Sequence, residues 1–289
     1  MENVAIQHIN EENLKTYYLN FDENGDKSQE LLDILMDSLL EFVFGIDYCN
    51  IDNPQLHQKF FNACEKLYKE KRNPQKEGDL GEIILHTLLR KYLNTFPLTG
   101  RFYFAVDKNT NAKSFDIIHI LPEPNKKILV LGESKMFKVG KKGIDALVDD
   151  IKKHFTADYA RKQFVKISAL THSSDEKIQK NIVIPTIQQI DDWEFKLRSA
   201  NTLDEVIDEL YVPLLCTYTY DEYTKHSRVS KEFIETYEKE MRELETYFRN
   251  KDINKPSCLS ILLMLFPIPD KDKLIEEYYK RIDKGCGKS

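Results

Sequence analysis

The sequence has no hydrophobic run long enough to cross a membrane and few residues that break a chain. Its longest apolar run, Ile261–Phe266, is followed by Pro267, whereas a membrane-spanning helix needs about 20 apolar residues. Glycine and proline contribute only 10 residues each to the 289, which excludes a fibrous chain or one dominated by linkers. Apolar residues make up 41% and charged residues 31%, so we expect a globular protein of one large domain or about two domains.

Cysteines and targeting signals are scarce as well. The five cysteines are dispersed and form no Cys-x-x-Cys pair, which favours reduced thiols and argues against a zinc knuckle. The N-terminus lacks a basic segment followed by an apolar stretch, so we expect no secretory signal. Together these features predict a cytoplasmic protein that makes no use of a membrane.

Positive charge is in deficit overall but is concentrated locally. The formal net charge is -6, from 42 basic and 48 acidic residues. Residues 1–50 hold 11 acidic and 2 basic side chains, a net of -9, whereas residues 126–166 hold 11 basic and 5 acidic side chains, a net of +6. Screening confines charge effects to about 10 Å, so the second segment is a candidate phosphate-binding surface. The alternative interpretation is a solvated helix face.

The apolar pattern predicts helices before a sheet. Ser28–Ile46 is apolar over most of its circumference, which predicts burial in the core or against a partner. Two further helices, each with one apolar stripe, are predicted at Pro54–Lys71 and Glu77–Tyr92. We therefore divide the chain into a helical acidic N-terminal region, residues 1–75, and a second domain, residues 76–289.

Short segments rich in aromatic and β-branched residues follow, which predict strands. Three such segments are separated by turn residues and predict an antiparallel meander: Arg101–Val106, Ser114–Leu121 and Lys127–Glu133. Later helices and strands are expected at Gly143–Ser168, Ile182–Ile184, Tyr211–Tyr218, Lys231–Arg249 and Ser260–Ile268. This order predicts an α/β (α+β) fold with a mixed central sheet flanked by helices.

The sharpest group of polar residues lies on the second and third predicted strands. Asp116 stands in the apolar context FDII, and Glu133 and Lys135 end the run ILVLGESK. Glu133 and Lys135 are two residues apart, so they project from the same face of a strand. The pattern of an acid, any residue and lysine is unspecific, because it also starts at Asp150, Asp175 and Glu194. Only the Glu133 copy closes an apolar strand and has an in-strand acid upstream.

Two neighbouring carboxylates repel each other unless a cation lies between them. If the two strands are neighbours, Asp116 lies beside Glu133, and Mg²⁺ fits best because it takes few carboxylates and keeps waters that attack phosphorus. Lys135 would then orient or help deprotonate a water and stabilise charge in the transition state. The alternative is an ordinary ion pair at a strand end.

A third carboxylate comes from the helix before these strands. Glu82, in the segment GDLGE, lies at the edge of the helix face that carries Leu85 and Leu89, where it can reach a metal held by the other two acids. It also fits the role of a first-turn acid that complements the helix dipole.

The order of these acids resembles the PD-(D/E)xK nuclease superfamily, which has a Glu on a helix, an Asp on the second strand and Glu-x-Lys on the third. Phe115 stands where the superfamily usually has Pro. This resemblance covers roughly residues 78–170 and implies a restriction-endonuclease-like core. More narrowly, GDLGEIILHTLL, FDIIHI and LGESKMFK resemble the HamA family of the bacterial Hachiman antiphage system, and this likeness runs over most of the chain.

The resemblance implies a metal-dependent DNA nuclease that works with a helicase partner, HamB. It assigns metal binding to Asp116, Glu133 and the backbone carbonyl of Ser134, with Glu82 as a further ligand and assisting acid. It assigns the catalytic lysine to Lys135, and Mg²⁺, with Mn²⁺ as an alternative, as the cofactor.

Basic residues after this motif are candidate DNA contacts. We expect phosphate contacts from Lys138, Lys141, Lys142, Lys152, Lys153, Arg161 and Lys162. Such contacts carry no sequence information. A complete nuclease needs a restraint, and we expect the partner to cover this surface until the helicase engages foreign DNA.

The final residues, GCGKS, resemble a phosphate-binding loop, but the glycine that such a loop requires is Ile282. We therefore expect no nucleotide to bind to this chain and assign any ATP use to the partner. His86, His119 and His154 show no helical spacing, which argues against a zinc site.

Two further hypotheses remain open. The chain is alternatively an inactive nuclease-fold adaptor that binds nucleic acid or the helicase, or a structural protein whose acidic N-terminus binds a basic partner. An adaptor has no need of a lysine beside two carboxylates, which favours the enzyme.

Overall fold

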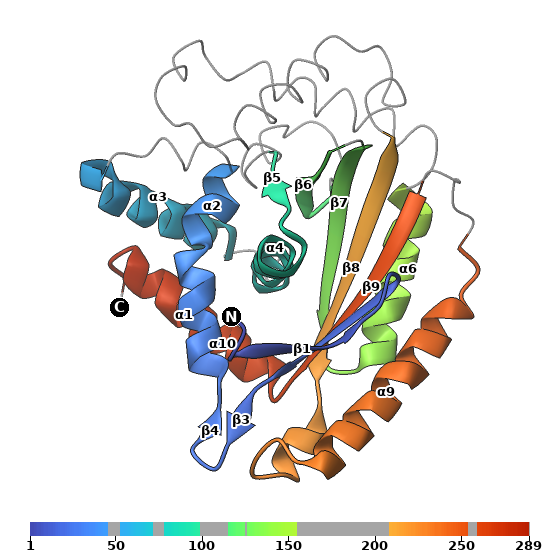
Figure 1. Cartoon of the computed structure of the whole chain (residues 1–289). Coiled ribbons are helices and arrows are strands. Elements are labelled where there is room, and N and C mark those ends of the chain that lie inside the picture. The colour runs from blue at the N-terminus through green and yellow to red at the C-terminus, as the bar shows by residue number, and fades with distance from the viewer. Residues whose placement is uncertain are drawn as a thin grey trace.

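A single curled sheet of seven strands organises the computed structural model, which describes residues 1–45, 53–71, 78–98, 115–124, 126–154, 208–253 and 259–288 (Figure 1). The strand order is β1-β2-β9-β8-β7-β6-β5. The strands are β1 (Ala5–Asn10), β2 (Leu14–Leu19), β5 (Phe96–Pro97), β6 (Ile117–Glu123), β7 (Lys126–Phe137), β8 (Glu209–Thr219) and β9 (Leu259–Ile268). A separate small hairpin joins β3 (Phe21–Asp22) to β4 (Gly25–Asp26).

The centre of the sheet is parallel and its two sides are antiparallel. β7 runs parallel to β8, β8 to β9, and β9 to β2. β1 with β2, β5 with β6, and β6 with β7 are antiparallel pairs. β8 and β9 are almost continuously apolar, as expected of strands that are covered on both faces. The mixed sheet with flanking helices confirms the predicted fold class.

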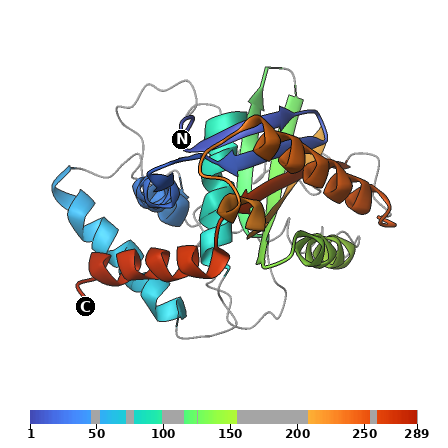
Figure 2. The same ribbon diagram turned by 90° about the horizontal axis from the view of Figure 1, so that it is seen from below.

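Helices cover both faces of this sheet (Figures 1 and 2). On one side lie α1 (Ser28–Asp37), α2 (Leu39–Phe44), α3 (Asn53–Lys71), α4 (Asp79–Leu93) and α10 (Lys271–Gly285). On the other side lie α6 (Gly140–His154) and α9 (Lys231–Arg249), with the short 3₁₀ helix η3 (Asp221–Thr224) before α9. Figure 2 shows α10 lying across α3.

Local sequence explains where the best-defined helices begin and which face they bury. The Ser230 hydroxyl accepts a hydrogen bond from the Phe233 amide at 3.1 Å and caps α9, a contact worth about 1 kcal/mol. Phe233, Tyr237 and Met241 recur every four residues along α9 and are fully buried. The rings of Phe233 and Tyr237 pack against Tyr18 of β2, so α9 is fixed on the sheet.

The N-terminal region departs from the prediction. It is not all helical, because residues 5–26 form strands and β2 pairs with β9 at the centre of the chain's main sheet. Leu14, Tyr17 and Leu19 are fully buried, so this region contributes to the common core. The predicted helix Ser28–Ile46 is two helices, α1 and α2, which bury their leucines in that core. The apolarity of this segment is thus satisfied within the chain.

Most of the remaining predictions hold with shifted bounds. The helix predicted at Lys231–Arg249 is confirmed, and the strands expected at Ser114–Leu121, Lys127–Glu133, Tyr211–Tyr218 and Ser260–Ile268 correspond to β6, β7, β8 and β9. α6 begins three residues earlier than expected. Arg101–Val106, Ile182–Ile184 and the end of the helix expected to Ser168 lie outside the described residues. Among the helices described, none is long and apolar enough to cross a bilayer.

Candidate active site

The antiparallel pairing of β6 with β7 brings the predicted site residues together. Ile117 lies opposite Gly132, and the Asp116 amide continues the ladder by donating to the Gly132 carbonyl at 3.1 Å. Asp116 therefore directly precedes β6, rather than lying inside the strand, and sits beside Glu133. The expected proximity of the two carboxylates is confirmed.

Neighbouring residues of β7 face two different helices. A Cβ atom added to Gly81 of α4 would lie 3.2 Å from the Ser134 hydroxyl and 3.1 Å from Met136 Cγ, so Ser134 and Met136 face α4. Lys135 instead reaches α6, where its Nζ lies 2.6 Å from Asp150 Oδ2. Since strand residues alternate, Glu133 shares the α6 side with Lys135.

Ser134 orients Asp116. Its backbone amide donates to Asp116 Oδ2 at 2.9 Å, and its hydroxyl donates to the same oxygen at 3.1 Å. These two bonds fix the carboxylate against the start of β6. The prediction assigned only the carbonyl of Ser134 to the site, so its amide and hydroxyl are contributions that the sequence reasoning missed.

Glu133 is a buried acid in a negative environment. It is 2% exposed, and burial together with the charge of Asp116 holds the pKa of its carboxyl well above the ordinary value, with smaller contributions from Asp150 and Glu82. The nearby Lys135 ammonium, 3.8 Å from Glu133 Oε2, acts in the opposite direction. A site that crowds carboxylates in this way favours a proton or a cation.

Lys135 supplies the positive charge of this cluster. Burial lowers the pKa of its ammonium, but the charges of Asp116 and Glu133 and the hydrogen bond to Asp150 outweigh burial, so the pKa is raised. The surrounding carboxylates thus favour the charged form of Lys135.

Asp150 is a site residue that the motif reasoning dismissed. It begins one of the unspecific acid-x-Lys patterns, yet it binds Lys135 directly and also lies 3.6 Å from the Lys153 ammonium. A signal was present in the sequence, because Asp150 adjoins Leu147 and Ile151 on the apolar stripe of α6. An acid at the edge of a buried stripe is a candidate for a buried ion pair.

Glu82 lies in the first turn of α4 and is partly buried. A Cβ atom added to Gly78 would lie 3.3 Å from Glu82 Oε1, so the carboxylate points back toward the start of the helix. This placement fits the dipole role, and the effect of Glu82 on the pKa of Glu133 shows that its charge reaches the cluster. Its role as a metal ligand stays a prediction.

The donor set is compatible with a divalent cation. Asp116 and Glu133 offer carboxylate oxygens, the ligands that Mg²⁺ prefers, and Mg²⁺ needs only one or two of them because it keeps several waters. Within the described residues, no group of three or more His, Cys, Asp and Glu side chains is arranged to hold a metal. The pair Asp116 and Glu133 fits a largely hydrated Mg²⁺ better than a fully enclosed ion.

The predicted phosphate contacts are spread over the β7–α6 turn and α6. Lys142 and Lys152 are exposed. Lys138 lies 2.7 Å from Asp272 of α10, Lys153 is near Asp150, and Lys141 lies 5.5 Å from the Tyr247 ring centroid. Arg161 and Lys162 lie outside the described residues. The surface is therefore basic but partly engaged within the chain.

Two histidines that the sequence separates form a buried network behind the site. His86 Nδ1 of α4 lies 3.1 Å from His119 Nε2 of β6, and His119 Nδ1 lies 2.8 Å from the Thr95 hydroxyl. His86 Nε2 lies 3.2 Å from Glu41 of α2, which also accepts from Arg90 at 2.8 Å. The network ties the helix that carries Glu82 to the strand that follows Asp116.

Comparison with known proteins identifies the family. The HamA family model matches residues 2–282, nearly the whole chain. No curated protein matches the chain. The match extends over the Asp116, Glu133 and Lys135 cluster and over both faces of the sheet. The chain therefore belongs to the HamA family and is a protein of the Hachiman defence system.

Proposed function

We propose that the chain is a metal-dependent DNA nuclease that hydrolyses phosphodiester bonds at the cluster of Asp116, Glu133 and Lys135 and acts with a helicase partner, HamB, that restrains it. The observation that supports this proposal is the convergence of two carboxylates and a partly buried ammonium where β6 and β7 pair, with Asp150 reaching the same point from α6. A core that serves only for packing does not require four charged groups around a buried carboxylate.

Each residue has a distinct role in this proposal. A divalent cation, when bound, would supply Lewis acidity and an activated water. Asp116, oriented by Ser134, and Glu133 would hold it through their carboxylate oxygens. Lys135 stays an ammonium, consistent with its raised pKa, and donates toward the negative charge that develops on the phosphate. Asp150 holds Lys135 in place.

Cleavage by purified variants tests the proposal. Supercoiled plasmid is incubated with the full chain over a Mg²⁺ series, with Mn²⁺ in a parallel series. Lys135→Ala and Glu133→Ala are expected to abolish cleavage while circular dichroism and urea unfolding report a folded chain. Lys231→Ala, at an exposed ion pair with Glu235, is the matched surface control. Wild-type cleavage rates in both site variants would refute the enzyme at this position.

The second candidate is an inactive adaptor that keeps the nuclease fold to bind nucleic acid or the helicase. The specific observation in its favour is the ion pair between Lys135 and Asp150 at 2.6 Å, which engages the lysine within the chain. An adaptor predicts that the wild-type chain binds DNA without cleaving it in either metal.

A further inference from the structure

A basic groove lies between the start of α6 and the second half of α9, away from the carboxylate cluster. It has a volume of about 560 Å³, and Lys141, Lys239, Arg242, Glu243 and Tyr247 line it together with two neutral polar residues. Lys141 and Lys239 thus lie opposite Glu243, beside Arg242, whose charge is shared with Glu11 and Glu245. Such a lining favours a ligand with several negatively charged oxygens.

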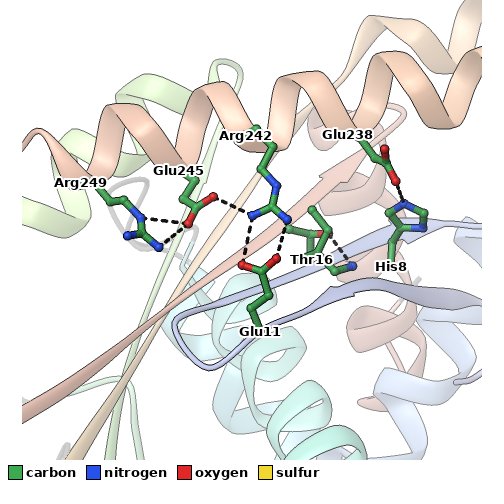
Figure 3. A network of polar contacts seen from close by, with 8 residues as sticks. His8, Glu11, Thr16, Glu238, Arg242, Glu245 and Arg249 are labelled. Carbon is green, nitrogen blue, oxygen red and sulfur yellow. Dashed lines mark hydrogen bonds and ion pairs between the residues drawn. The ribbon is translucent and has the colours of Figure 1, made fainter.

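The α9 wall of the groove is anchored to the sheet, as Figure 3 shows. Arg242 donates from Nη1 to Glu11 Oε2 at 3.1 Å and to Glu245 Oε2 at 2.9 Å, and from Nη2 to Glu11 Oε1 at 2.5 Å. These contacts use three of the five guanidinium N–H donors. Arg242 is therefore a fixed cation that still has donors, whereas the exposed Lys239 lies one turn away on the same helix.

The α6 wall is anchored through Tyr247. Its hydroxyl donates to Asp145 Oδ1 at 2.9 Å, and its ring lies 3.9 Å from the Lys251 ammonium and 5.5 Å from the Lys141 ammonium. Lys251 also pairs with Asp145 at 2.6 Å, so the Asp145 charge is compensated locally. The ring attracts Lys141 through a cation–π interaction and positions it at the groove.

α6 connects this groove to the candidate active site. Lys141 begins the helix, and Asp150, which binds Lys135, follows nine residues later. At about 1.5 Å per residue the two positions are about 14 Å apart along the axis. Consecutive phosphates of one strand lie farther apart than the rise of about 3.4 Å per nucleotide along the duplex axis, so this span covers fewer than four of them. A strand cleaved at the carboxylate cluster can therefore place a neighbouring phosphate in the groove.

We propose that the groove is a second phosphodiester-binding subsite, which holds the nucleic-acid backbone within a few nucleotides of the scissile phosphate through Lys141, Lys239 and Arg242. This inference rests on the proposed function and adds α9 to the nucleic-acid surface. The contacts are electrostatic, so the subsite raises affinity without reading bases.

Charge reversal on α9 tests the subsite with a matched control. Lys239→Glu and Lys231→Glu change the net charge equally, and each places a glutamate four residues from an existing one, Glu243 or Glu235. Binding of a fluorescent DNA duplex is measured by anisotropy in EDTA, so that no cleavage occurs, over a salt series. We expect Lys239→Glu to weaken binding roughly 10-fold and to reduce the salt slope by about one, with little effect from Lys231→Glu.

Cleavage assays separate the subsite from the chemistry. At saturating DNA, Lys239→Glu should keep kcat and raise KM, whereas Lys135→Met should lose kcat and keep DNA binding. If the wild type never cleaves DNA but Lys239→Glu still weakens binding selectively, the subsite stands and the proposed function fails. Equal effects of the two α9 reversals, or none, would overturn the subsite. Unchanged DNA binding with loss of helicase binding in Lys239→Glu would also overturn it, in favour of a protein ligand.

Discussion

Lys135 of β7 is held at 2.6 Å by Asp150 of α6, while Glu133, two residues before it on the strand, lies farther away at 3.8 Å. The lysine of the Glu-x-Lys motif is thus bound more closely by a helix on the sheet's face than by its motif partner. The position of α6 consequently sets the position of the ammonium.

Asp150 should therefore affect activity through Lys135, without itself contacting the reacting atoms. Asp150→Asn removes the charge that holds Lys135 and should lower DNA cleavage by about 10–100-fold, the range typical for outer residues that orient a site. Asp149→Asn, at the exposed neighbouring acid of α6, is the control and should leave cleavage unchanged. Equal cleavage rates in both variants would show that the ion pair serves only stability.

Ionised Glu133 should lower the free energy of unfolding in the absence of metal. Burial and neighbouring carboxylates raise its pKa, so ionised Glu133 is less favourable in the folded state than in the unfolded state at neutral pH. Glu133→Gln keeps the shape and removes this charge. We expect the free energy of unfolding in urea with EDTA to rise by about 0.5–2 kcal/mol while Mg²⁺-dependent cleavage is lost. A lower urea midpoint would contradict this account of the carboxylate.

The close contact between α6 and β8 should depend on Gly143. A Cβ atom there would lie 2.5 Å from Cys216 Sγ, closer than non-bonded atoms can approach. Gly143→Ala should cost about 1–3 kcal/mol of stability through overpacking, and adding Cys216→Ala should restore part of it. Urea unfolding of both single variants and the double variant gives the coupling. A coupling of zero would mean that α6 accommodates the methyl group elsewhere.

The buried histidine pair should make stability fall in acid. Burial lowers the pKa of His86 and of His119. At His86, the hydrogen bond and charge of Glu41 partly offset burial, whereas at His119 the charges of His86 and Arg90 lower the pKa further. The unfolded state then binds protons below about pH 6.5 that the native state does not bind, so stability decreases as pH falls, by up to about 1.4 kcal/mol per unit for each histidine.

Urea unfolding of the wild type and of His119→Gln at about pH 7 and about pH 5 measures this effect. The variant should lose less stability between the two values. Glu133 titrates in the opposite sense, so only the difference between the two proteins reports on the histidine. Parallel pH dependences would contradict the prediction.

Sequence patterns predicted the parts of the fold that follow one local period. The apolar stripe of Phe233, Tyr237 and Met241 predicts α9. The apolar runs of β8 and β9 indicate buried strands. The N-terminal strands were missed because β1 and β2 carry interspersed polar residues. They pair locally as a hairpin, and only the pairing of β2 with β9 spans more than 240 residues. Pairing over that distance leaves no local signal.

The site residues also fall into two groups: those that local sequence patterns predict and those that depend on tertiary packing. Asp116, Glu133 and Lys135 were found because strand alternation and one hairpin place them together. Asp150 and the contact between His86 and His119 depend on how α6 and α4 pack on the sheet, which spacing along the chain does not encode. Lys138 was expected on the DNA surface, but Asp272 of a distant helix holds it.

The last prediction concerns restraint by the helicase. If the partner covers the basic surface of α6, it must compete with DNA for the exposed lysines Lys142 and Lys152. Crosslinking of the chain to DNA should decrease when the partner is added, and the double variant Lys142→Glu/Lys152→Glu should weaken both interactions, because complementary charge drives both. Lys91→Glu, on α4 and paired with Glu2, should affect neither. Partner binding that leaves DNA bound would place the restraint away from this surface.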